Sequence, residues 1–278
     1  MKDGSPLVSC VCVTRNRVHV LKRAIGCFLA QSYPNKELII QYESDDSSTP
    51  SLREAYAAHP EIKWHQVDDK PKLTLGERRN LSIERSSGEY FCQWDDDDWY
   101  HADRIRDQLS AVLSTHQSAS IMTNRLIFDA SKRTAYFSHL RLWESSILCR
   151  RDALTADVRY PARNRMEDTY FTKALVENNR VYPHVLPTHY IYVINHGNIS
   201  PQSHFDLLLA ASQPLSPALS RLVADILDGT YSPETASRIL TSSDVLHEIK
   251  YFFVNNITGT TEQLKKFEEL IGEGPSPV

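Results

Sequence analysis

The sequence lacks an apolar stretch near the roughly 20 residues that a membrane-spanning helix requires, and its first residues, Met1–Pro6, contain no signal-peptide core. It also lacks a long run of Lys or Arg, and its net charge of -4 gives no indication of a general nucleic-acid binder. Its five cysteines are an odd number in mostly apolar segments, so we expect buried reduced thiols rather than a zinc site. These absences predict a cytoplasmic protein and leave peripheral contact with the inner face of a membrane open.

Motifs of three other enzyme classes are missing near the first predicted strand, Leu7–Val13. No GxGxxG follows this strand, which disfavours a dinucleotide-dependent oxidoreductase. The turn after it, Thr14–Arg17, contains no aspartate to serve as the nucleophile of a phosphohydrolase, and it lacks the Gly-rich basic loop of nucleotidyltransferases. A magnesium-dependent phosphate-transfer enzyme stays as an alternative function.

Strand and helix patterns alternate over about the first hundred residues. The predicted strands are Leu7–Val13, Glu37–Tyr42, Ile62–Val67 and Tyr90–Trp94. The helices between them predict an α/β fold, with a mostly parallel central sheet that is flanked by helices on both faces. The length of 278 residues allows one large domain with a small extension.

The pattern changes after the helix predicted over Ala102–Leu113. A mixed or antiparallel extension of the sheet is expected, because further strands follow without clear helices between them. These strands are predicted at Ser120–Phe128, Thr134–Leu140 and Ser145–Leu148, followed by a helix at Met166–Glu177 and a strand at Tyr190–Ile194. We place a domain boundary near residue 200, with an α/β domain at 1–200 and a C-terminal helical appendage at 201–278. The mixed charges of the appendage favour packing, as in a homo-oligomer, over membrane docking.

Four consecutive aspartates, Asp95–Asp98, directly follow the strand Tyr90–Trp94. Carboxylates this close repel one another unless a cation lies among them, and Mg²⁺ readily bridges protein carboxylates to substrate phosphates. The carboxyl ends of parallel strands share one edge of the sheet, so Thr14–Arg17, Asp45–Ser48 and Asp95–Asp98 are expected to converge on one crevice. The resulting hypothesis is a phosphate-bearing substrate held through a metal, with a solvated acidic loop as the alternative.

With these segments in order, the chain resembles a family 2 glycosyltransferase with the Rossmann-like GT-A fold. The matching pieces are Val8–Arg17, Asp45–Ser48, Arg78-Arg79-Asn80, Asp95–Asp98 and the pair Glu167-Asp168. Each piece is weak alone, but their order and spacing are specific, and the resemblance covers about residues 6–198. It implies an inverting transfer of a sugar from a nucleotide diphosphate donor, most often a UDP-sugar, to a glycan or lipid-linked saccharide during polysaccharide assembly.

The resemblance implies a divalent cofactor, Mn²⁺ or Mg²⁺. Asp97 matches the metal-binding final aspartate of the DxD motif, with Asp95 as the first, although the frame one residue later satisfies the pattern as well. His196 lies where some GT-A enzymes recruit a further metal ligand or phosphate contact, and His189 is a weaker rival.

The donor site and the catalytic base are also implied by the resemblance. Asp46 matches a position that binds the nucleotide base, and Arg78 or Arg79 falls where the family places a basic residue near the nucleotide. The residues implied in donor binding are Thr14, Asn16, Asp45, Asp46, Arg78, Arg79, Asp95 and Asp96. Asp168 matches the catalytic base of the Glu167-Asp168 pair.

The chemistry of an inverting transfer requires such groups independently of the resemblance. The acceptor hydroxyl needs a carboxylate that takes its proton, and this base must face the side opposite the leaving group. Asp168 lies on a different segment from the aspartate run, at the start of a predicted helix whose N-terminus favours the ionised form. A non-catalytic module that binds sugar nucleotides is the alternative, and it requires Asp168 to be remote from the acidic cluster.

Overall fold

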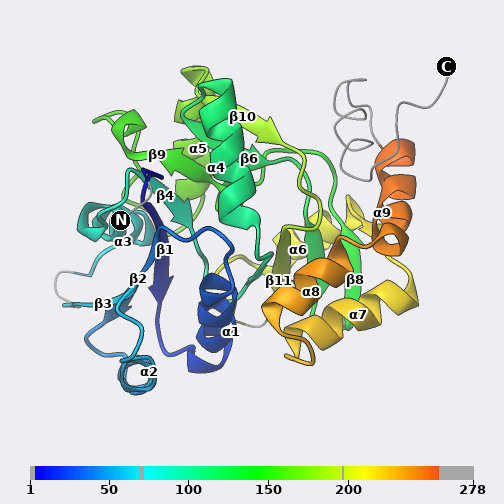
Figure 1. Ribbon diagram of the computed structural model, residues 1–278, viewed down its shortest axis with the longest axis horizontal. Helices are drawn as coiled ribbons and strands as arrows, with labels where there is room; N and C mark the ends of the chain where they lie inside the picture. The colour runs from blue at the N-terminus through cyan, green and yellow to red at the C-terminus, as the bar shows by residue number, and fades with distance from the viewer. Residues whose placement is uncertain (1–3, 69–71, 196, 257–278) are drawn as a thin grey trace. The chain divides into compact units, whose positions relative to one another are not determined.

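A computed structural model describes residues 4–68, 72–195 and 197–256 (Figure 1). These residues divide into two units, and each is described by itself. The first unit takes in Met1–Asp98, Ala102–Ile121 and Glu144–Tyr182, as far as these ranges are described. The second takes in Trp99–His101, Met122–Trp143 and Pro183–Val278 with the same restriction. The chain therefore passes between the two units at several points.

The first unit is built on a seven-stranded sheet with the order β10-β6-β9-β4-β1-β2-β3 (Figure 1). Its strands are β1 (Val8–Thr14), β2 (Lys36–Glu43), β3 (Ile62–Val67), β4 (Tyr90–Gln93), β6 (Ala119–Met122), β9 (Leu148–Arg150) and β10 (Val181–His184). β1 pairs in parallel with β2 and β4, and β2 pairs in parallel with β3. β9 is antiparallel to both β4 and β6. The parallel part around β1 and the antiparallel extension beyond β4 confirm the predicted sheet.

The apolar run that forms β1 explains its central place in the sheet. Six of its seven residues are buried, as expected for a parallel strand that is covered on both faces. The helices of this unit are α1 (Val18–Leu29), α2 (Thr49–Ala55), α3 (Leu75–Arg85), α4 (Arg104–Thr115) and α5 (Glu167–Glu177). α3 packs against β1 and β2, and it begins with a capping box in which Thr74 and Glu77 each bind the other's backbone N–H.

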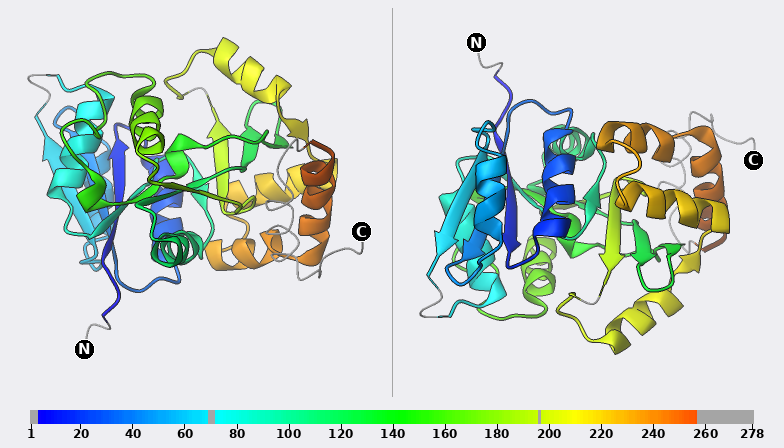
Figure 2. Two further views of the ribbon diagram at one scale, coloured as in Figure 1. Left: turned by 90° about the horizontal axis from the view of Figure 1, so that it is seen from above. Right: turned by 90° about the horizontal axis from the view of Figure 1, so that it is seen from below.

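The second unit contains a five-stranded sheet with the order β12-β8-β7-β11-β5. Its strands are β5 (Trp99–Tyr100), β7 (Leu126–Asp129), β8 (Thr134–Phe137), β11 (Tyr190–Ile194) and β12 (Gln213–Pro214). Four helices, yellow to orange in Figure 2, complete its described part: α6 (Gln202–Ala210), α7 (Pro217–Leu227), α8 (Pro233–Leu240) and α9 (Ser243–Asn256). α7 packs on β7 and β8, while Phe205 and Leu208 of α6 join Ile127 and Trp143 in one apolar core. Residues 257–278 of the expected appendage lie outside the described residues.

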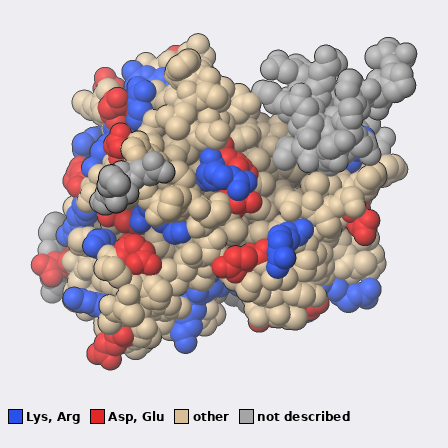
Figure 3. All heavy atoms as spheres, viewed as in Figure 1, with Lys and Arg blue, Asp and Glu red and all other residues tan. Residues whose placement is uncertain are grey.

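Two features of the chain bear on membranes and polyanions. Within the described ranges, every helix is too short or too polar to cross a bilayer. On the face shown in Figure 3, the described acidic and basic side chains are interspersed rather than gathered into one area of a single sign.

The five cysteines are all free and buried, which confirms the prediction of buried reduced thiols.

Several elements differ from the sequence prediction. The segment expected as one strand at Ser120–Phe128 is two strands, β6 and β7, which belong to different sheets. The strand expected at Ser145–Leu148 is wrong, because Glu144–Ser146 forms a short 3-10 helix and β9 begins only at Leu148. Short apolar runs cannot by themselves indicate where a chain leaves one sheet for another.

Candidate active site

The polar segments that follow β1, β2 and β4 contact one another at the carboxyl ends of these strands. Thr14, the last residue of β1, donates from Oγ1 to Asp96 Oδ2 at 2.6 Å. The backbone N–H of Asn16 donates to Asp46 Oδ2 at 2.8 Å. The structure thus brings four of the predicted donor-binding residues together, at the edge where open α/β sheets place their ligands.

Asp46 ties the loop after β1 to the start of α2. Besides the bond from Asn16, its carboxylate accepts hydrogen bonds from the backbone N–H groups of Ser48 at 3.0 Å and Thr49 at 2.9 Å. It also accepts one from the Thr49 hydroxyl at 2.6 Å. Burial alone would raise the pKa of Asp46, but these hydrogen bonds outweigh it and hold the pKa below its ordinary value. The carboxylate is therefore ionised at neutral pH and stabilises the loop that would lie beside a nucleotide.

A buried glutamate, Glu43 at the end of β2, holds two arginines near this loop. Arg15 Nη1 lies 3.1 Å from Glu43 Oε2, and Arg78 of α3 also pairs with Glu43. Arg15 contacts Asp45 as well, where both side chains are about two-fifths exposed. Arg78 and Asp45, two of the predicted donor-binding residues, are thus linked through Arg15 and Glu43.

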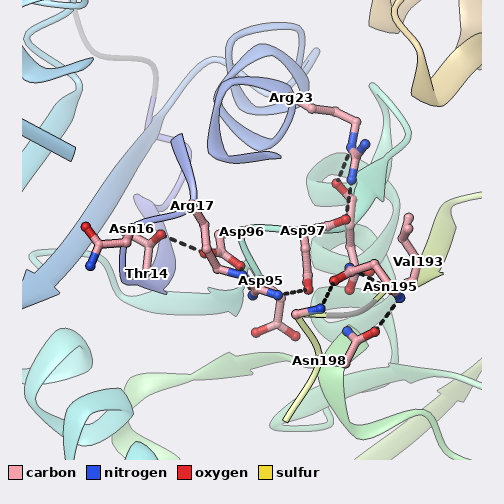
Figure 4. Close-up of polar contacts among 12 residues, drawn as sticks. Thr14, Asn16, Arg17, Arg23, Asp95, Asp96, Asp97, Val193, Asn195 and Asn198 are labelled. Atoms are coloured by element: carbon pink, nitrogen blue, oxygen red, sulfur yellow. Dashed lines mark hydrogen bonds and ion pairs between the residues drawn. The ribbon is translucent and has the colours of Figure 1, made fainter. Parts of the chain in front are cut away.

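Arg17 neutralises two of the four consecutive aspartates (Figure 4). Its Nη1 lies 2.8 Å from Asp96 Oδ1 and its Nη2 lies 2.9 Å from Asp97 Oδ2. Burial raises the pKa of Asp96 to about 7 and the charge of Asp97 adds to the rise, whereas Arg17 and Thr14 oppose it. Arg23 of α1 donates to the backbone carbonyls of Asp97 and Asp98, so the run is held through its main chain as well.

Arg79 connects the aspartate run to the start of α5. Its Nη2 lies 3.3 Å from Asp95 Oδ1, its Nη1 lies 3.1 Å from Glu167 Oε1, and its guanidinium lies 5.5 Å from the centre of the Tyr160 ring. Gln93 closes the arrangement, because its Nε2 donates to Asp95 Oδ2 at 3.0 Å and its Oε1 accepts from Tyr160 Oη at 3.0 Å. The buried guanidinium therefore joins two carboxylates that are 72 positions apart in the sequence, as Asp95 and Glu167.

Burial affects the pKa of each charged group in the bridge that Asp95, Arg79 and Glu167 form. It raises the pKa of both Asp95 and Glu167, and Arg79 opposes the rise at each carboxylate. Burial alone would lower the pKa of Arg79, but Asp95 and Glu167 together raise it above its ordinary value. The guanidinium is therefore permanently charged and holds both neighbours towards the ionised form.

Asp168, the predicted base, lies half-buried in the first turn of α5 next to Glu167. Its Oδ1 accepts the backbone N–H of Thr169 at 2.8 Å. Its negative charge contributes to the raised pKa of Asp95. Asp168 is therefore near the acidic run rather than remote from it, and Arg79 and Glu167 form the connection between them.

The carboxylates of the run are suitable ligands for Mn²⁺ or Mg²⁺ if water and substrate phosphates complete the coordination of the ion. Within residues 4–68, 72–195 and 197–256, no group of three or more His, Cys, Asp or Glu side chains could enclose a metal ion. Mg²⁺, however, commonly takes one or two protein carboxylates and completes its shell with water and substrate phosphates. Asp97 and Asp95 supply hard oxygen atoms at a site where burial, and then the charge of Asp97, raise the pKa of Asp96, so the donor set fits this mode.

The two histidines considered as metal ligands have different outcomes. His196 lies outside the described residues. His189 belongs to the second unit, is 3% exposed, and its ring is stacked on that of His101 at 4.2 Å between centroids. Trp94, the last residue of the predicted strand Tyr90–Trp94, is fully buried and donates from Nε1 to Ala24 O at 3.0 Å, so it packs in the core.

Sequence reasoning missed three residues that organise the site. Arg17 stands in the turn after the first strand, and a basic residue there, with four aspartates at a neighbouring strand end, was an available signal. Glu43 directly follows the predicted strand Glu37–Tyr42, and the structure buries its charge beside two arginines. Tyr160 lies in an irregular segment, and no sequence pattern indicates its contact with Arg79.

The fold and the acidic strand-end site define the class of protein. The sequence model of glycosyl transferase family 2 matches residues 9–168, which is more than half of the chain, and the chain belongs to this family. AmsB of Erwinia amylovora, an amylovoran biosynthesis glycosyltransferase, is 31% identical over 116 residues, which are 40% of this chain and 37% of that protein. EpsE of Bacillus subtilis, which carries a glycosyltransferase name, is 28% identical over 128 residues, or 46% of each chain. The matches thus span less than half the length of these relatives.

Solved structures share the fold at low sequence identity. Residues 1–349 of TarS from S. aureus superpose with a TM-score of 0.53 at 15% identity, covering 96% of this chain and 79% of that one. The mannosyltransferase PcManGT of Pyrobaculum calidifontis, solved with GDP-Man and Mn²⁺, gives a TM-score of 0.55 at 14% identity, covering 96% and 74%. These likenesses confirm the predicted GT-A fold.

Proposed function

We propose that this chain transfers a sugar from a nucleotide diphosphate donor to a saccharide acceptor, with inversion at the anomeric carbon. The observation that carries the proposal is the bridge from Asp95 through Arg79 to Glu167, because it joins the acidic run to the segment that contains Asp168. A module that only binds sugar nucleotides would not need a carboxylate near the reacting bond.

Asp168 is the proposed base. As the acceptor oxygen forms its bond to the anomeric carbon, Asp168 takes the hydroxyl proton, and the bond from that carbon to the diphosphate breaks with its electron pair on the diphosphate oxygen. Glu167 is paired with Arg79 at 3.1 Å, so we assign it to positioning α5 rather than to proton transfer.

The donor side of the site is proposed at the ends of β1 and β2. Asp45, Asp46, Thr14 and Asn16 would border the nucleoside, and Arg78, which Glu43 orients, would face the phosphates. Asp97 and Asp95 would hold Mn²⁺ or Mg²⁺, which when bound neutralises charge that develops on the departing diphosphate.

The identity of the substrates is supported by what related proteins bind. TarS has been solved with UDP and with UDP-GlcNAc, and PcManGT with GDP-Man and Mn²⁺. AmsB is named for the biosynthesis of a polysaccharide. We propose a UDP-sugar as the donor and a glycan or lipid-linked saccharide of a polysaccharide pathway as the acceptor.

Calorimetric titration with UDP, GDP and dTDP, each with and without Mn²⁺ or Mg²⁺, tests the donor site. We expect metal-dependent binding of one nucleotide. Release of nucleotide from the corresponding sugar donor, with water or added saccharides as acceptor, then measures turnover. Asp168→Asn should bind nucleotide like the wild type and lower turnover at least about 100-fold. Unchanged turnover in Asp168→Asn would refute its role as the base, and a wild-type protein that binds a nucleotide without any turnover would favour the non-catalytic module.

A further inference from the structure

Arg17 occupies the place where a cation is needed between Asp96 and Asp97 (Figure 4). Two different nitrogens of its guanidinium reach two different carboxylates, at 2.8 Å and 2.9 Å. The Arg17 side chain is 26% exposed, whereas the side chains of the two aspartates are 4% and 8% exposed. The guanidinium is thus the solvent-accessible member of a largely buried ionic group.

Arg17 is less constrained than Arg79, which also pairs with a carboxylate of the aspartate run. It precedes α1 as the N-cap residue but makes no side-chain capping bond, so its guanidinium can leave the aspartates without disturbing the helix start. Arg79, by contrast, is 9% exposed and is paired with carboxylates from two separate segments. Arg23 donates to the backbone carbonyls of Asp97 and Asp98.

A divalent ion that approaches Asp97 meets an oxygen atom that is already paired with Arg17. The guanidinium lowers the affinity of the pair for a second cation, because like charges repel at short range. A nucleotide diphosphate changes this balance, since its phosphates are themselves good partners for an arginine.

We propose that Arg17, which pairs with Asp96 and Asp97, is a built-in counter-cation that competes with divalent metal for Asp97 while the donor is absent, and that it pairs with the diphosphate once metal and donor bind together. The second half of this proposal rests on the proposed function, whereas the first half concerns the metal alone. The arrangement would make free Mn²⁺ a weak ligand and couple its binding to that of the nucleotide.

Titration with Mn²⁺ alone, followed by electron paramagnetic resonance of the free ion, tests the first half. Arg17→Gln should bind Mn²⁺ about tenfold more tightly than the wild type, because one positive charge near the carboxylates is gone. Arg15→Gln is the matched control, since Arg15 lies in the same turn but pairs with Glu43 and Asp45, and it should stay within about twofold of the wild type. Equal or weaker Mn²⁺ binding in Arg17→Gln would overturn the proposal.

Arg17→Lys tests whether a change in Mn²⁺ affinity comes from the lost charge or from a loosened loop. It keeps the positive charge without the two-pronged geometry, so its Mn²⁺ affinity should remain within about threefold of the wild type. Tightening as large as that in Arg17→Gln would mean that the loop, and not the charge, controls access, and the proposal would be wrong.

Titration with UDP or GDP at saturating Mn²⁺ tests the second half. Arg17→Gln should bind the nucleotide about tenfold more weakly than the wild type, opposite in sign to its effect on Mn²⁺ alone. Nucleotide binding that is unchanged or tighter would overturn the second half. If the wild type binds neither nucleotide, the proposed function fails, whereas the result with Mn²⁺ alone still decides the first half.

Discussion

Replacing Arg79 by methionine should destabilise the protein strongly. Methionine fills much of the same volume but leaves Asp95 and Glu167 without the cation that lies 3.3 Å and 3.1 Å from them. Removing one partner of a buried ion pair costs about 3–5 kcal/mol. Asp95 is only half-buried and keeps its hydrogen bond from Gln93, so we expect a loss near the lower limit, about 3 kcal/mol.

The pH dependence of this loss has a definite sign. Burial already raises the pKa of Asp95 and Glu167, and without Arg79 both values would rise further above the unfolded values of about 3.9 and about 4.3. Between the unfolded and folded pKa values the folded state binds more protons than the unfolded state, so stability falls as pH rises through this window. The deficit of Arg79→Met should therefore be largest near about pH 8 and should shrink towards about pH 5.

Urea unfolding of the full chain, followed by tryptophan fluorescence at both pH values, measures this deficit. Arg159→Met is the control, because Arg159 pairs with Glu84 at 3.1 Å on the surface, with both side chains about half exposed. It should cost less than about 1 kcal/mol at either pH. A loss in Arg79→Met no larger than that of the control, or one that grows as the pH falls, would refute the assignment of Arg79 as the cation of this bridge.

Three further changes have specific expected outcomes. Asp97→Ala should lose the metal-dependent part of nucleotide affinity, at least about tenfold in calorimetry, and undiminished affinity with Mn²⁺ would contradict its assignment. Asp46→Ala removes the acceptor of bonds from Asn16 and Thr49 and should lower the free energy of unfolding by about 2 kcal/mol. Because the folded pKa of Asp46 is lowered, this difference should persist at neutral pH and disappear only below about pH 4, as urea titrations would show. Gly76→Ala places a Cβ 1.9 Å from Pro161 O and should cost about 1–3 kcal/mol, whereas Gly4→Ala, with open space around it, should be neutral in the same measurement.

The sequence was sufficient to predict which strand ends meet. A run such as Val8–Val13, which is apolar except for Ser9, indicates a strand covered on both faces, and parallel strands bring their carboxyl ends to one edge. The 2.6 Å bond between Thr14 and Asp96, which are 82 positions apart, follows from that topology. The base and donor assignments remain predictions that depend on the experiments proposed above.

The sequence could not predict which carboxylates the two arginines of α3 face. The resemblance leaves Arg78 and Arg79 as equivalent basic residues near a nucleotide, and the short helix offers only Leu75, Leu81 and Ile83 as large apolar residues to fix its rotation. Successive residues of an α-helix point about 100° apart. Arg78 accordingly reaches Glu43, and Arg79 reaches Asp95 and Glu167. Only the packing of α3 against β1 and β2 determines which arginine faces which carboxylate.

The two arginines that neutralise the aspartate run differ in how freely they can be replaced. Arg79 is enclosed by Asp95, Glu167 and the Tyr160 ring, so its removal leaves the buried carboxylate of Glu167 without its cation. Arg17 is about one quarter exposed, and water or an incoming cation can take its place beside the aspartates. Arg79→Met should therefore change stability far more than Arg17→Gln does. If both variants lost stability equally and neither changed Mn²⁺ binding, the two arginines would have the same structural role, and the aspartate run would have no exchangeable cation.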